Sequence, residues 1–93
     1  MTWRAAAKMY SGRPDPEWDL DDEKGARLDE LWSRLPALND EPPEPPPLGY
    51  RGYVVERPDG VRYEGVPGAV TRGEERRADR DGEFERLVLE SQP

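Results

Sequence analysis

The residues of this chain that could do chemistry are carboxylates, arginines and tyrosines. Cysteine and histidine are both absent from the 93 residues, which excludes disulfides, thiol nucleophiles, zinc–thiolate sites and the commonest general base. The remaining side chains could support a reaction that uses paired carboxylates, such as glycoside hydrolysis. The sequence contains no phosphate-binding glycine loop and no nucleophile elbow.

Two groups of adjacent carboxylates could serve such a reaction: Asp21, Asp22 and Glu23, and Glu74 with Glu75. Glycosidases hold their two acids on opposite sides of a cleft. Adjacent acids at the start of a helix more commonly cap the helix and interact with its dipole. We therefore predict that the protein is not an enzyme, and that it has no catalytic residues, no metal site and no cofactor.

The least generic segment is YSGRPDPEWDL, and it carries two candidate recognition residues. Pro14 and Pro16 fix their own φ angles and favour extended backbone at the residues before them, Arg13 and Asp15. Arg13 and Asp15 could recognise a carboxylate or the backbone of a ligand, a role that suits the planar guanidinium of arginine. In the alternative interpretation, Arg13 and Asp15 form a local ion pair that fixes the loop.

Aromatic side chains are the second group of candidates. Trp18 could dock a partner, or it could pack in the core, because a domain poor in aliphatic residues needs its tryptophans inside. Tyr50, Arg51 and Tyr53 could contact a peptide at a sheet edge or open face, or they could pack across strands. The predicted partner-binding residues are therefore Arg13, Asp15, Trp18, Tyr50, Arg51 and Tyr53.

The first half of the chain contains the elements that would hold the proline-rich loop. Alternation predicts a strand over residues 2–10, followed by an ordered loop over 11–19. An i, i+3, i+4, i+7 apolar spacing predicts a helix over 22–35, capped by Asp21. A proline-rich linker follows over 36–48, and its proline run should adopt polyproline II geometry.

The second half of the chain predicts a hairpin and a final helix. Alternating segments on either side of the turn sequence RPDG predict a hairpin over 50–66. A short edge strand is expected from Ala69 to Arg72, then a charged loop over 73–81 and a helix over 82–91 capped by Asp81. The chain is thus predicted to be one small α+β domain, β-α-β-β-(β)-α, with a mostly antiparallel sheet and two helices.

The overall composition limits the classes of partner that the protein is expected to bind. A net charge of −7 argues against a nucleic-acid partner, which needs a basic surface. No apolar run reaches the ~18–20 residues of a membrane span, and the first residues lack a signal-peptide core, so no membrane partner and a cytoplasmic location are expected. Leucine, valine and phenylalanine make up only 15 residues and isoleucine is absent, so a homodimer is expected to add buried surface.

Two segments of this sequence resemble a group of small bacterial proteins. They are SGRPDPEW and, after the predicted helix and linker, GYRGY; in the group an SGRPNPxW segment is followed by a GYRG-aromatic segment. The chain departs from this pattern at Asp15, where asparagine is commoner. Some of these proteins resemble accessory factors of ribosomal-peptide natural-product clusters of the crocagin kind. The resemblance implies a non-catalytic protein that binds a precursor peptide or a modifying enzyme.

Three functional hypotheses follow from the sequence. The first is a dimeric accessory protein that pairs a peptide with a sheet edge near Tyr50–Val55, with specificity from the loop that carries Arg13, Asp15 and Trp18. The second is an acidic inhibitor or antitoxin-like protein that covers a basic partner. The third is an enzyme that uses only carboxylates, tyrosine and arginine.

Overall fold

The computed structural model describes residues 2–10, 14–39 and 49–93. In these ranges the chain forms six strands and two helices in the order β-β-α-β-β-β-β-α. The elements are β1 (Trp3–Tyr10), β2 (Glu17–Leu20), α1 (Asp22–Arg34), β3 (Gly49–Glu56), β4 (Arg62–Val66), β5 (Gly68–Arg72), β6 (Glu75–Asp79) and α2 (Glu83–Glu90). The predicted α+β class, antiparallel sheet and two helices are confirmed. The proline run of the predicted linker lies outside the described residues.

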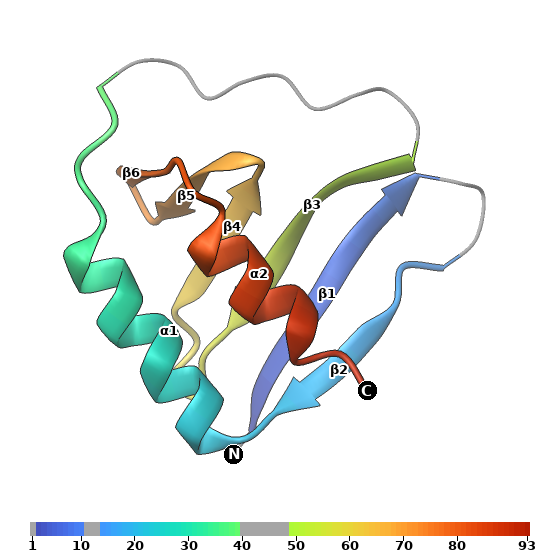
Figure 1. The fold of residues 1–93 in the computed structure, drawn as a ribbon. Coiled ribbons are helices and arrows are strands. Elements are labelled where there is room, and N and C mark those ends of the chain that lie inside the picture. The colour runs from blue at the N-terminus through green and yellow to red at the C-terminus, as the bar shows by residue number, and fades with distance from the viewer. Residues whose placement is uncertain (1, 11–13, 40–48) are drawn as a thin grey trace.

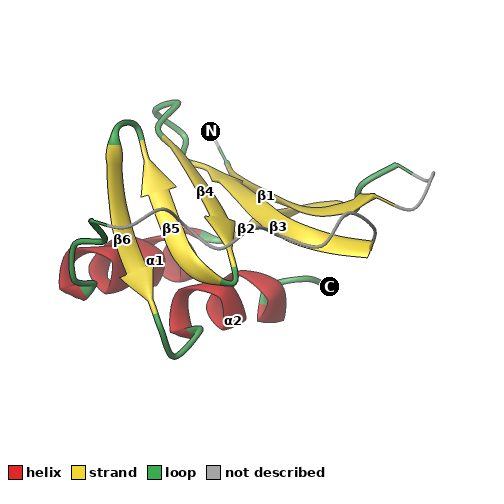
Figure 2. Ribbon diagram, turned by 90° about the horizontal axis from the view of Figure 1, so that it is seen from above, coloured by secondary structure: helices red, strands yellow, loops and turns green. Residues whose placement is uncertain are grey.

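All six strands form one antiparallel sheet with the order β2-β1-β3-β4-β5-β6. The helices α1 and α2 lie on the same face of this sheet (Figures 1 and 2), and no described helix covers the other face. We refer to that second face as the open face. Two strands lie where loops were predicted: β2 overlaps the end of the predicted loop 11–19, and β6 lies within 73–81. Since β6 pairs with β5, the predicted edge strand β5 lies inside the sheet.

Aromatic rings provide much of the core between the sheet and the helices. All three tryptophans are buried, as are Tyr53, Tyr63 and Phe84. The Tyr63 ring lies 5.3 Å from Phe84 and 5.5 Å from Trp32, centroid to centroid and tilted in both pairs, a geometry that aromatic pairs favour. Large rings therefore supply the apolar area that the few aliphatic residues do not.

The helix α1 begins as the sequence predicts. The Asp21 carboxylate accepts a hydrogen bond from Lys24 N at 2.8 Å, which satisfies one of the free N–H groups of the first turn. Gly25, an unfavourable residue inside a helix, packs directly against Trp3. A Cβ atom at Gly25 would lie 2.1–2.5 Å from atoms of the Trp3 indole, so this close approach requires glycine.

The start of α2 differs from the prediction. The predicted cap, Asp81, makes no capping bond, and the N-cap position is Gly82, whose φ is 68°. The buried carboxylate of Asp79 instead accepts hydrogen bonds from Phe84 N and Glu85 N, both at 3.1 Å. The turn between β6 and α2 places the Asp79 carboxylate beside the first turn of the helix. Asp79 lies five residues before Phe84, so a search for a cap directly before the helix does not find it.

Candidate partner-binding surface

Two of the predicted binding residues, Trp18 and Tyr53, belong to the core. Their exposed fractions are 5% and 0%. Trp18 Nε1 donates to Ser91 Oγ at 2.7 Å, and Ser91 in turn donates to Val88 O, which holds the C-terminal end of α2 behind β2. The Tyr53 hydroxyl is buried and has no hydrogen-bond partner among the described residues. Both side chains therefore pack inside the protein, which was the alternative to a role in partner contact.

Tyr50 and Arg51 are partly buried on β3. The Tyr50 hydroxyl donates to Glu85 Oε2 at 2.8 Å; burial, followed by this bond and the charge of Glu85, raises the pKa of Tyr50 far above its ordinary 10.0. β3 lies between β1 and β4 in the sheet, and β4 pairs with Tyr53–Glu56, so the predicted pairing of a peptide with an edge near Tyr50–Val55 is wrong for Tyr53–Val55.

Asp15 is exposed and joins the proline-rich loop to β1. Its Oδ1 accepts a hydrogen bond from Met9 N at 2.8 Å, and Pro16 O accepts one from Ala7 N at 3.1 Å. Asp15 therefore fixes the loop through the β1 backbone. Arg13 lies outside the described residues, and so does the predicted ion pair between Arg13 and Asp15.

The strand β2 forms one end of the sheet. Pro16 is opposite Ala7 in the register and accepts its N–H, so this is a hydrogen-bonded pair. Such pairs alternate along antiparallel strands, which directs the backbone groups of Trp18 toward β1 and those of Glu17 and Asp19 away from the sheet. Within the described part of the chain, no strand pairs with this outer side of β2.

The other end of the sheet is closed by the chain itself. The segment after α1 runs along β6, where Ala78 N donates to Pro36 O at 2.8 Å and Leu38 N donates to Arg76 O at 3.0 Å. Ala37 completes this contact with an antiparallel bridge to Arg77. Of the two sheet ends formed by the described residues, only the β2 end presents an open edge.

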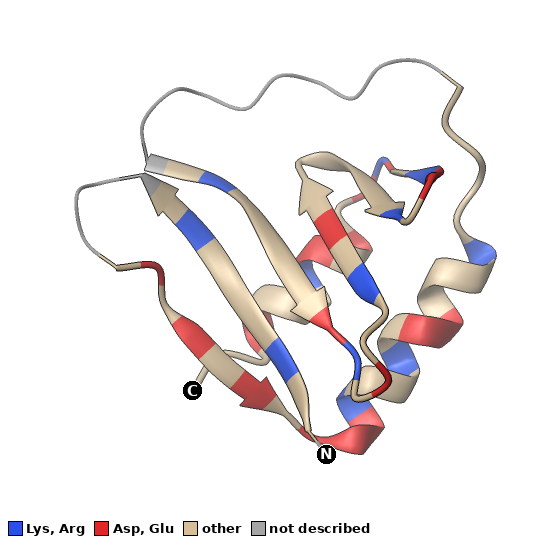
Figure 3. Ribbon diagram, turned by 180° about the vertical axis from the view of Figure 1, so that it is seen from behind, with Lys and Arg blue, Asp and Glu red and all other residues tan. Residues whose placement is uncertain are grey.

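Acidic side chains line the open edge. Glu17 and Asp19 point to the open face, and Arg4 of β1 bridges them, with NH1 2.9 Å from Asp19 Oδ1 and NH2 3.7 Å from Glu17 Oε2. Figure 3 shows acidic bands on β2 beside basic bands on β1. Residues 15–23 contain six carboxylates and no cation, and all six are exposed: Asp15, Glu17, Asp19, Asp21, Asp22 and Glu23.

A shallow depression on the open face adjoins this edge. Its volume is about 340 Å³, and its apolar lining residues are Ala5, Ala6 and Val54. The charged residues that surround them include Arg4, Lys8, Glu17 and Glu56. We call the outer side of β2, the side chains of Asp15, Glu17 and Asp19, and this depression the β2 edge site.

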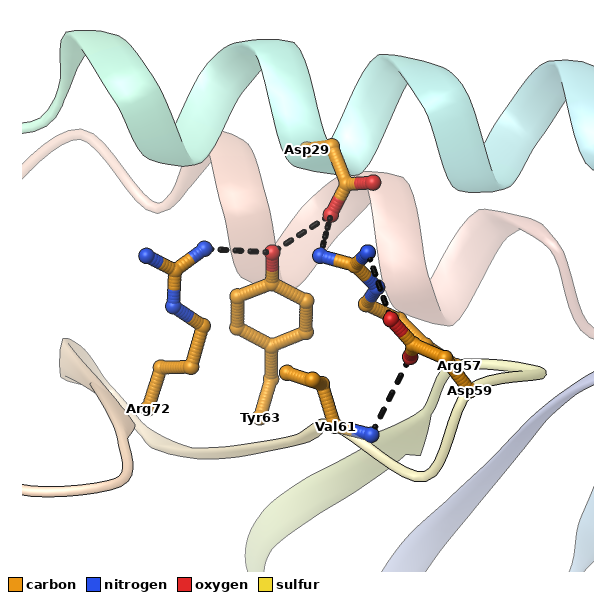
Figure 4. Close-up of polar contacts among 6 residues, drawn as sticks. All are labelled: Asp29, Arg57, Asp59, Val61, Tyr63 and Arg72. Atoms are coloured by element: carbon orange, nitrogen blue, oxygen red, sulfur yellow. Dashed lines mark hydrogen bonds and ion pairs between the residues drawn. The ribbon is translucent and has the colours of Figure 1, made fainter.

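A second polar cluster lies on the helix side of the sheet (Figure 4). The Tyr63 hydroxyl donates to Asp29 Oδ1 at 2.5 Å and accepts from Arg72 NH1 at 3.5 Å. Arg57 NH1 lies 3.6 Å from Asp29 Oδ1, and Arg57 NH2 lies 2.9 Å from Asp59 Oδ2. Burial, and then the bond to Asp29, raises the pKa of Tyr63, so this hydroxyl keeps its proton. The cluster joins α1 to β4 and to the β3–β4 turn, so its role is to stabilise the packing of the helix on the sheet.

Three of the five carboxylates considered as catalytic candidates have structural contacts, among them Glu23, which pairs with Arg27 at 3.2 Å. Asp21 caps α1, and Glu75 pairs with Arg77 of the same strand. In residues 2–10, 14–39 and 49–93, no group of three or more acidic, histidine or cysteine side chains could hold a metal ion. Neither of the two helices there is long and apolar enough to cross a membrane.

No protein-family model, curated protein or solved structure matches this chain. The β2 edge site is therefore judged from its own chemistry. It offers outward backbone donors and acceptors, a regular row of carboxylates and a neighbouring depression. The sequence predicted a loop over residues 11–19, whereas Glu17 to Leu20 form a strand. The alternation of charged and apolar residues there is the local signal for that strand.

Proposed function

We propose that the protein is a non-catalytic accessory protein that binds an extended segment of a peptide or partner protein as an additional strand along β2. The observation that carries this proposal is the difference between the two ends of the sheet. At β6 the edge is closed by residues 36–38, whereas at β2 the backbone groups of Glu17 and Asp19 point outward. Strand addition derives affinity from main-chain hydrogen bonds and specificity from alternate side chains.

The partner and setting that we propose follow from the sequence. The resemblance of the SGRPDPEW segment to accessory proteins of ribosomal-peptide clusters supports a precursor peptide as the bound segment, in the bacterial cytoplasm. The small number of aliphatic residues supports a homodimer. Such a dimer would use a surface other than the β2 edge, because two copies of β2 would set like charges against each other.

A proline substitution tests strand addition directly. Asp19→Pro removes an N–H that points away from the sheet, so no bond to β1 is lost, and proline is tolerated on edge strands. Asp19→Ala is the matched control, because it removes the same carboxylate and keeps the N–H. By calorimetry against the peptide encoded beside this protein, we expect Asp19→Pro to bind roughly fivefold to tenfold more weakly than Asp19→Ala.

A second candidate is a protein that covers a basic surface of its partner through its side chains. The net charge of −7 and the six carboxylates over 15–23 favour it. A covering protein would not depend on the backbone of β2, so Asp19→Pro and Asp19→Ala would then bind equally. Its affinity would also fall steeply with added salt, because exposed charges are screened over about 10 Å at moderate ionic strength.

A further inference from the structure

The carboxylates of the β2 edge site indicate the chemistry of the segment that would pair with β2. We propose that this segment is cationic, with Lys or Arg at every second position and small uncharged or apolar residues between them. The inference rests on the proposed function and narrows it from any extended segment to one class. The carrying observation is that Asp15, Glu17 and Asp19 are all exposed and recur at alternate positions.

The register of an added strand places its charges on the open face. In an antiparallel pair, the side chains directly opposite each other lie on the same face, with Cβ atoms about 4.5–5.5 Å apart. Arg4 contacts Glu17 Oε2 and Asp19 Oδ1 from the β1 side. The other oxygen of each carboxylate has no partner among the described residues, so a cation on the added strand could bind there.

The positions between the cations face a different environment. They would lie beside Trp18 and Leu20, which point into the core and are 5% and 3% exposed. The bond from Trp18 to Ser91 fixes the end of α2 on this side, and Figure 1 shows the C-terminus next to β2. A charged side chain there would lose hydration against apolar atoms, so small uncharged or apolar residues fit best.

A second copy of this chain is a poor occupant of the same edge. Two β2 strands in antiparallel pairing would bring the acidic residues of one copy opposite those of the other. Like charges directly opposite each other destabilise a strand pair, and Arg4, the β1 cation opposite Asp19 in the register, already contacts Glu17 and Asp19 of its own copy. The charge at the edge therefore favours a different, basic chain.

Three short synthetic peptides test the inference. In the first, lysine alternates with valine; in the second, the same residues are arranged as a lysine block and a valine block; in the third, threonine replaces every lysine. We expect the alternating lysine peptide to bind at least about tenfold more tightly than either control at physiological ionic strength. The amide hydrogens of Glu17 and Asp19 should become protected from exchange in that complex.

Two conservative variants test the role of the carboxylates. Glu17→Gln and Asp19→Asn keep the side-chain shapes and remove one charge each from exposed positions, so the fold should be retained. Each should weaken binding of the alternating lysine peptide by about twofold to fivefold, the range measured for exposed ion pairs. The threonine peptide should respond to neither substitution.

The outcomes separate the two proposals. Equal affinity for the alternating and block lysine peptides, or no binding of either, would overturn the cationic-strand inference. Equal affinity for the threonine peptide, with Glu17 and Asp19 protected, would overturn the charge requirement and leave strand addition in place. Tight binding of the alternating peptide without protection of these amides would overturn strand addition itself.

Discussion

Two tyrosines buried in the core differ in what their hydroxyl groups contact. Tyr63 donates to Asp29 at 2.5 Å, whereas the hydroxyl of Tyr53 has no partner in the part of the chain that the structure describes. The residue type alone does not tell the two apart, because tyrosine suits protein contacts as well as cores. Their surroundings decide the matter: one connects a helix to the sheet, and the other fills space above Gly65.

This difference predicts opposite results for the same substitution. Tyr63→Phe should lower the free energy of unfolding by about 1–3 kcal/mol, because Asp29 loses its hydrogen bond from the tyrosine and keeps the longer contact with Arg57. Tyr53→Phe should leave it unchanged or raise it slightly, because a buried hydroxyl without a partner is removed. Urea denaturation of both variants measures this, and equal losses of stability would contradict the assignment of the two hydroxyl groups.

The described tyrosines also predict the behaviour of the protein in alkali. Burial is the first cause that raises the pKa values of Tyr50, Tyr53 and Tyr63 above the ordinary 10.0. A raised pKa means that the folded state binds these protons more tightly than the unfolded state. Their contribution to stability is therefore complete below pH 10 and is lost as the pH rises further.

Tyrosinate absorbance and circular dichroism, followed together, test this. We expect ionisation of these three tyrosines to accompany the loss of structure, because unfolding exposes them. Ionisation of all three near pH 10, with the circular dichroism of the folded protein unchanged, would show that they are accessible in the fold.

At the scale of elements, the ends of the helices provide a direct comparison between sequence and structure. The cap of α1 was correctly predicted because its signal is local: Asp21 stands three residues before the amide that it binds. The predicted cap of α2 was wrong because the helix is capped by Asp79, at the end of β6, across the turn that precedes the helix. Local spacing identified the helix but not the acid that caps it.

We expect the two acids near α2 to respond differently to alanine. Asp79→Ala should lower the free energy of unfolding by about 0.5–2 kcal/mol, the range for a lost N-terminal cap. Asp81→Ala, at an exposed position with no capping bond, should change it by less than about 0.5 kcal/mol. Thermal unfolding of both variants checks this, and a larger loss for Asp81→Ala would restore the cap that the sequence suggested.

The strands show which signals a sequence carries. β3 and β4 were predicted as a hairpin because alternation and an RPDG turn are local. β6 has no apolar alternation; its Arg77 instead donates to Trp32 O and lies 4.6 Å from the Trp32 ring centroid, contacts that depend on a distant helix. The position of β3 inside the sheet depends on pairing with β1, some 45 residues earlier in the chain, and no local pattern encodes that.

At the scale of the whole molecule, the sheet is asymmetric in two ways. Both helices cover one face and leave the other open (Figure 2). Among the described residues, one end of the sheet is closed by residues 36–38, while the outer side of β2 has no paired strand and is lined by carboxylates. The composition predicted an acidic protein without catalytic machinery, and the fold places six of its carboxylates, over residues 15–23, at and beside β2, whose outer side pairs with no described strand. This combination is the basis of the proposed function.

Open edges in natural proteins are commonly short and charged, which discourages aggregation. β2 has both properties, because it has four residues and two of them are exposed acids on the open face. The same properties allow selection among partners, because a strand of complementary charge is accepted where a neutral or acidic one is not. The account therefore depends on whether the outer side of β2 is unpaired in the free protein.

Amide hydrogen exchange of the free protein, resolved by residue with NMR, measures this most directly. The account predicts slow exchange at Trp18 and Leu20, whose N–H groups are directed toward β1. It predicts fast exchange, close to that of unprotected amides, at Glu17 and Asp19. Protection of Glu17 and Asp19 equal to that of Trp18 would mean that the edge is already paired, and would contradict the proposal that β2 receives a partner strand.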